Sequence, residues 1–83
     1  MKTTRYFQED ILGGKRSYIK REWCEAILRN PEYTEAQEDG RIRHWGYIEE
    51  IGKFLRVVTL ENRETVHNAM PDRSYTPRQR RET

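Results

Sequence analysis

Three residues of this 83-residue chain have side chains that could carry out a reaction together: His44, Arg56 and His67. A histidine can act as a general acid or base near neutral pH. An arginine can hold a phosphate and stabilise the charge that develops on it. Together they would suit cleavage of an RNA phosphodiester, in which the 2′-hydroxyl attacks its own phosphate. This chemistry needs the three residues on one surface, so it depends on the elements that carry them.

The central part of the chain predicts an antiparallel meander. Segments rich in aromatic and β-branched residues are typical of strands. This chain has three such segments, at residues 41–48, 53–60 and 65–70. The interruptions 49–52 and 61–64 are short enough only for tight connections. Asn62 tolerates a positive φ, whereas Arg63 is not the usual second residue of such a turn, so the type of this turn stays open.

Residues 17–30 predict the main helix. Apolar side chains recur there at four-residue spacing and form one stripe, made of Ile19, Trp23 and Ile27. Ser17 is a candidate N-cap, and Pro31 cannot continue the helix interior. We expect Trp23 to anchor the helix on the sheet and Cys24 to be a small buried filler rather than a nucleophile.

The remaining segments complete an α+β fold, with one main helix packed on a three- to four-stranded antiparallel meander sheet. Residues 4–7 could add an edge strand, and the acidic residues 32–40 read as a solvated loop. We expect a single domain over residues 1–76. Residues 77–83 read as a basic, flexible tail that carries Arg78, Arg80 and Arg81.

Strand alternation sorts the residues of the sheet onto two faces. A first connection centred on Ile51 places Trp45 opposite Val57. A second turn at residues 62–63 places Val58 opposite His67 and Arg56 opposite Ala69. The helix-covered face then carries Trp45, Tyr47, Leu55, Val57, Val66 and Met70. The other face carries His44, Arg56 and His67, framed by Ile42, Phe54 and Val58.

A structural interpretation of the three candidate catalytic residues stands beside this one. His44 and His67 can be ordinary cross-strand neighbours, and Arg56 can pair with a glutamate. An error of one residue in either register would scatter the cluster. Two histidines are too few for a zinc site, and the acidic loop matches no calcium-binding pattern. The sequence therefore predicts neither a metal nor another cofactor.

Composition sets broad limits. The formal net charge is +2, which does not show nucleic-acid binding by itself, although the 16 basic residues could cluster on one face. With 34% hydrophobic and 36% charged residues, the core must be thin, so self-association or a partner that covers apolar surface is expected. A single cysteine and the lack of a membrane-span-like run favour a cytoplasmic protein without membrane contact.

The chain resembles a family of small bacterial proteins whose layout is similar to that of the RelE/ParE/BrnT toxins of toxin–antitoxin pairs. The resemblance covers residues 18–75. It rests on a helix that ends at Asn30–Pro31, on the acidic segment that follows it, and on the segments GRIRHWGYIEE, KFLRVVTLE and ETVHNAMPDRSY.

The resemblance implies a RelE/ParE-like fold, a toxin neutralised by a small antitoxin-like protein, and metal-independent cleavage of mRNA, often on the ribosome. It also suggests basic residues on the sheet and a basic or aromatic residue near the C-terminus. The nucleic-acid-binding candidates are Arg41, Arg43, Lys53, Arg73 and Tyr75, beside the catalytic candidates His44, Arg56 and His67. The alternative hypothesis is a non-catalytic module that binds a protein or a nucleic acid.

Overall fold

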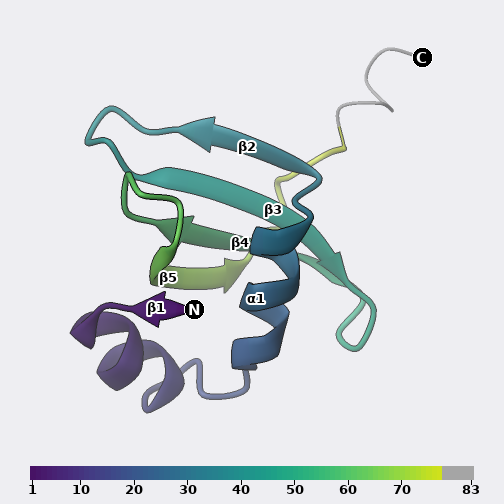
Figure 1. Ribbon diagram of the computed structural model, residues 1–83. Helices are drawn as coiled ribbons and strands as arrows, with labels where there is room; N and C mark the ends of the chain where they lie inside the picture. Colours follow the sequence, from purple (N-terminus) through teal and green to yellow (C-terminus); the bar gives the residue numbers. More distant parts are fainter. Residues whose placement is uncertain (78–83) are drawn as a thin grey trace.

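The computed structural model describes residues 1–77 and shows an α+β fold with one five-stranded sheet (Figure 1). The strands are β1 (Lys2–Thr3), β2 (Tyr33–Ala36), β3 (Ile42–Ile48), β4 (Lys53–Thr59) and β5 (Thr65–Pro71). Their order in the sheet is β1-β5-β4-β3-β2. β1 runs parallel to β5, and the other pairs are antiparallel. A π-helix, η1 (Phe7–Leu12), and an α-helix, α1 (Arg21–Arg29), separate β1 from β2.

The predicted meander is confirmed as β3, β4 and β5, whose ends lie within one residue of the expected bounds. The sheet is larger than predicted, because the expected loop 32–40 contains β2. This strand pairs with β3 over its whole length, with Tyr33 opposite Trp45. In the described part of the chain, β2 has a neighbour on one side only, and it stays partly exposed. Polar residues are therefore tolerated there, and the hydrophobic pattern that marks an inner strand is missing.

α1 is shorter than the predicted helix 17–30. Lys20 has an extended backbone, with φ −88° and ψ 140°, so Lys20 and not Ser17 is the N-cap residue. Ile19 precedes the helix but is still buried. At the other end, the N–H of Asn30 donates to the carbonyl of Ala26 before the chain reaches Pro31.

The N-terminal segment forms a short strand and a helix instead of an edge strand at residues 4–7. The edge strand is β1, which pairs with Thr65 and Val66. In η1, Phe7 and Ile11 are four residues apart and are both buried. That spacing places both side chains on one side of the helix, against the core.

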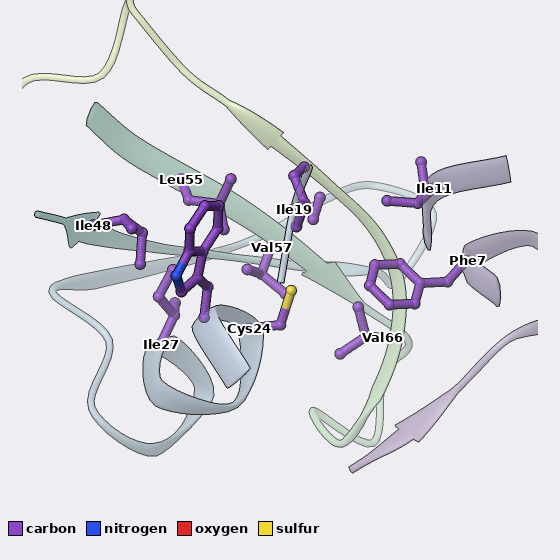
Figure 2. Close-up of a cluster of buried hydrophobic side chains, with 11 residues drawn as sticks. Phe7, Ile11, Ile19, Cys24, Ile27, Ile48, Leu55, Val57 and Val66 are labelled. Carbon is purple, nitrogen blue, oxygen red and sulfur yellow. The ribbon is translucent and has the colours of Figure 1, made fainter. Parts of the chain in front are cut away.

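The core lies between the helices and one face of the sheet (Figure 2). Leu55, Val57 and Val66 face the helices as predicted. α1 contributes the buried side chains of Trp23 and Cys24. In Figure 2, Phe7 and Ile11 lie at one end of the cluster and Ile48 lies at the other. α1 approaches β3 so closely that a Cβ on Gly46 would lie 2.7 Å from Cγ1 of Ile27.

The β4–β5 turn differs from the prediction at one residue. Arg63, and not Asn62, takes the positive φ, at 62°. Asn62 supports the turn with its side chain, because its Oδ1 atom accepts hydrogen bonds from the backbone N–H groups of Glu64 and Thr65, both at 2.9 Å. Such local bonding is typical of asparagine in turns.

The expected basic tail lies almost entirely outside the described residues. Its first residue, Pro77, is buried, and Arg78, Arg80 and Arg81 belong to the part of the chain that is not described. Within residues 1–77, no helix is long and apolar enough to cross a membrane.

Candidate nucleic-acid interface

The register between β3 and β4 separates the three candidate catalytic residues. Trp45 lies opposite Arg56, and His44 lies opposite Val57. The turn 49–52 connects the directly paired residues Ile48 and Lys53, so it is not centred on Ile51. This changes the pairing by one residue and moves every side chain of β3 to the other face.

The prediction that His44, Arg56 and His67 share one face is therefore wrong. His44 points toward α1 and is buried, with Nε2 at 2.9 Å from the hydroxyl oxygen of Thr59. Trp45, Tyr47 and Met70 are also on the face opposite to the predicted one. A mechanism with two histidines as acid and base is not assembled, since the sequence contains only these 2 histidines.

The face of the sheet turned away from α1 is called the open face here, and Figure 1 shows α1 crossing the other side of the sheet. Strand pairing and alternation place on the open face Arg43, Trp45, Tyr47, Phe54, Arg56, Val58, Asn68 and Met70. No helix of residues 1–77 packs on it. It combines arginines with aromatic rings, which are the side chains that contact phosphates and bases in nucleic-acid complexes.

A bulge in β5 brings His67 to the border of this face. Val58 pairs with Asn68 and Thr59 pairs with Val66, so His67 has no residue opposite it on β4. An extra residue in one strand redirects a side chain in this way. His67 Nδ1 lies 3.0 Å from the Thr4 hydroxyl, and its ring stacks on Tyr6 with the centroids 5.0 Å apart.

Three arginines and His67 surround a cavity of about 230 Å³ on the open face, called the arginine groove here. Arg41, Arg43 and Arg56 line it, together with Gln37 and Asn68. None of the described residues that line it is acidic. Clustered guanidinium groups on a concave surface create a positive potential that attracts anions.

The arginines of the groove are held by neighbours but keep donor capacity. Arg43 donates to Gln37 Oε1 at 3.1 Å and to Glu35 at 3.4 Å. Arg56 is held by Met70 Sδ at 2.7 Å and lies 3.6 Å from Asp72. The Nε atom of Arg56 is buried and has no hydrogen-bond partner within residues 1–77. A guanidinium has five N–H donors, and the contacts described here occupy only part of them in Arg43 and Arg56.

The groove disfavours a charged histidine. Burial and the positive charge of Arg41 lower the pKa of His67, and Asp39 opposes this effect. His67 is therefore mostly neutral at pH 7. A neutral imidazole beside the arginines can donate or accept a hydrogen bond, depending on its tautomer. The local positive charge of the groove at this pH comes from the arginines.

An aromatic cluster occupies the other end of the open face. The rings of Tyr33, Trp45 and Tyr75 form a stack, with centroid distances of 5.6 and 5.1 Å. Phe54 contacts Tyr47 and Tyr75 edge-on, at 5.2 and 5.0 Å. Trp45 is only 5% exposed, whereas Tyr47 is 53% exposed. Tyr47 therefore offers a ring face at the surface, while Trp45 holds the cluster together.

Asp72 fixes the segment that follows β5 onto this cluster. Its carboxylate accepts hydrogen bonds from Trp45 Nε1 at 2.9 Å and from the Ser74 hydroxyl at 2.7 Å. Burial alone would raise the pKa of Asp72, but the hydrogen bonds from Trp45 and from the side chain and backbone of Ser74, with the positive charge of Arg56, outweigh burial and lower it. An ionised Asp72 holds Tyr75 near Trp45, and the distance to Arg56 links the cluster to the arginine groove.

The sequence-predicted binding residues fall into two neighbouring groups. Arg41 and Arg43 meet Arg56 and His67 at the arginine groove. Lys53, Arg73 and Tyr75 line a second hollow, next to Phe54. Sequence reasoning missed Gln37, Asn68 and Tyr47 as neighbours of the binding residues, whereas it placed Phe54 correctly on the face that carries Arg56. The alternation of Arg43, Trp45 and Tyr47 was a usable signal, and the wrong register placed it on the covered face.

Residues 1–77 contain no group of three or more His, Cys, Asp or Glu side chains placed to hold a metal ion. Cys24 is buried under the sheet, and burial raises the pKa of its thiol to about 12. Thiolate chemistry at neutral pH is thereby disfavoured.

No family model, no curated protein and no solved structure matches this chain.

Proposed function

We propose that this protein is an RNA-binding module that holds the sugar–phosphate backbone in the arginine groove. The observation that carries the proposal is the convergence of Arg41, Arg43 and Arg56 on one concave patch with no acidic lining residue among those described. Arginine is well suited to this role, since its planar fork can donate two parallel hydrogen bonds to one phosphate.

Local charge matters more than net charge for such a site. The whole chain carries only +2, but phosphate contacts depend on the potential near the groove, because salt screens charges beyond about 8 Å at physiological ionic strength. Arg41 is 3.9 Å from Asp39, which is a weak and exposed pair. An incoming phosphate can replace such a pairing at little cost.

Binding without catalysis is the form of the hypothesis that the geometry supports. The only histidine at the groove is His67, and His44 lies across the sheet beneath α1. Phosphodiester cleavage by general acid and general base needs two proton-transfer groups at the phosphate. The described residues around the groove supply arginines, amides and one histidine, which suit binding better.

A titration of labelled single-stranded RNA, followed by fluorescence anisotropy at several salt concentrations, tests this function. We expect a Kd of about 1–100 µM near physiological salt, typical of backbone contacts. Three phosphate contacts predict that log Kobs falls with log salt with a slope of about −2. Absence of binding at low salt, or affinity that does not change with salt, would contradict the proposal.

A toxin role is a second candidate. It is supported by the open face, on which no helix of residues 1–77 packs, together with the resemblance to RelE/ParE/BrnT toxins. In that case RNA binding would inhibit translation, and a small antitoxin-like partner would cover the open face. Expression of the protein with and without a co-encoded small protein, followed by growth and RNA integrity, tests this role. Growth arrest that the partner relieves is the expected result. Normal growth at full expression would contradict it.

A further inference from the structure

A second hollow lies beside the arginine groove and is lined by aromatic rings. Its volume is about 260 Å³, and Phe54, Pro71 and Tyr75 form its apolar walls. The rings of Phe54 and Tyr75 meet at an angle of 64°, with their centroids 5.0 Å apart, and form a corner. The volume is slightly below the range of about 300–1,000 Å³ that is typical of sites for drug-sized ligands. A single planar ring system suits such a space.

The charges around this hollow suit the phosphates that flank a base. Lys53 and Arg73 lie among its lining residues. Among residues 1–77, the one acidic residue that lines the hollow is Asp72, whose side chain is 10% exposed and already accepts hydrogen bonds from Trp45 and Ser74. Its carboxylate is therefore engaged by Trp45 and Ser74, and Lys53 and Arg73 add positive charge near the hollow.

The hollow and the arginine groove are one step apart on the sheet. Phe54 and Arg56 point to the same side of β4 and are two residues apart, which corresponds to about 7 Å along the strand. On β5, Met70 lines the groove and its neighbour Pro71 lines the hollow. A nucleotide whose phosphate lies near Arg56 would thus carry its base, or the next base, to Phe54.

We propose that this hollow binds one unpaired base of the RNA whose backbone lies in the arginine groove, so that the ligand is single-stranded. The inference rests on the proposed function and adds the class of RNA. Bases stack on aromatic side chains when they are exposed, whereas in a duplex they are paired and stacked inside. A duplex would engage the arginines only.

The test compares three probes on the wild-type protein: labelled oligoadenylate, its duplex with oligouridine, and inorganic polyphosphate as a polyanion without bases. We expect oligoadenylate to bind about 10-fold more tightly than the duplex, since stacking of one base on an aromatic ring contributes an effect of this size. Equal affinity for single strand and duplex would overturn the inference, and this comparison needs no variant.

Ring-removing variants then locate the contact. Phe54→Leu and Tyr75→Leu should each weaken oligoadenylate binding about 10-fold and leave the salt slope and polyphosphate binding unchanged. Tyr75→Phe keeps the ring and should bind like the wild type. Tyr18→Leu is the matched control, because Tyr18 is an exposed tyrosine that lies outside the sheet. Circular dichroism verifies that all variants are folded.

The outcomes separate the two proposals. If the wild type binds no polyanion, the arginine groove and the base site both fail. If it binds, and if arginine substitutions weaken binding while both leucine variants keep full preference for oligoadenylate, only the base site is refuted.

Discussion

The Nε2 atom of His44 lies 2.9 Å from the hydroxyl oxygen of Thr59, on the face of the sheet that α1 covers. Both residues are buried, and His44 Nδ1 has no hydrogen-bond partner within residues 1–77. Burial, with a smaller contribution from the positive charge of Arg63, lowers the pKa of His44 to about 4. His44 is therefore a neutral core residue at pH 7.

This buried histidine predicts a loss of stability in mild acid. The folded pKa of about 4 lies below the ordinary value of 6.5, so the unfolded chain takes up the proton first as the pH falls. The free energy of unfolding should keep its neutral-pH value well above pH 6.5. Protonation of His44 in the unfolded chain should lower it by about 3 kcal/mol as the pH falls to 4. Urea denaturation of the wild type and of His44→Gln across this pH range measures the effect. Identical pH dependence in both proteins would show that His44 is not responsible.

Cys24 should be unreactive in the folded protein. It is fully buried in the core, and its thiol pKa is raised to about 12. We expect almost no alkylation by iodoacetamide at pH 8 in buffer and complete alkylation in denaturant. Cys24→Ser should cost about 1–3 kcal/mol more than Cys24→Ala, because a buried hydroxyl loses its hydration. Fast alkylation of the native protein would contradict the packing shown in Figure 2.

Gly46 sets the distance between α1 and the sheet. A Cβ at this position would meet Ile27 Cγ1 at 2.7 Å, so Gly46→Ala should destabilise the protein by about 1–3 kcal/mol. The cost should be smaller in an Ile27→Ala background, where space is available. A double-mutant cycle of unfolding free energies measures this coupling. Strictly additive effects would mean that the two residues do not touch.

Arg63 stores local strain in the β4–β5 turn. Its φ of 62° is a conformation in which a Cβ is disfavoured. Arg63→Gly should therefore stabilise the protein by about 0.5–1 kcal/mol, whereas Arg63→Ala removes the charge but keeps the Cβ and should bring no such gain. Thermal denaturation of the two variants distinguishes them, and equal melting temperatures would contradict the strain argument.

The parts of the fold that sequence patterns predicted are those with a strong local signal. Segments rich in β-branched and aromatic residues marked β3, β4 and β5, and the spacing of Trp23 and Ile27 marked α1. β2 had no such signal, because an edge strand needs only one apolar side. η1 was missed even though Phe7 and Ile11 have helical spacing, since the segment contains few other apolar residues.

The candidate site depended on register, which local patterns do not fix. Both faces of β3 carry large side chains, so hydrophobicity could not decide whether His44 or Trp45 lies under α1. The turn 49–52 decided it by pairing Ile48 with Lys53. On β5, the bulge beside Val58 brought His67 to the arginine groove, and a bulge has no clear sequence signature here. On β4, the placement of Arg56 and Val57 on opposite faces was predicted correctly, because inward and outward side chains alternate regularly along this strand.

RNA affinity after removal of charge from the arginine groove tests most directly whether this groove binds RNA. The groove variant carries Arg41→Gln and Arg56→Gln. The control variant carries Arg21→Gln and Arg29→Gln, which remove the same charge from α1 on the covered side of the sheet. The groove variant should raise the Kd at least about 10-fold and make the salt slope shallower by about 1.4, whereas the α1 variant should stay close to wild type. Equal losses in both variants, or a groove variant that binds like the wild type, would contradict the claim that the arginine groove holds RNA.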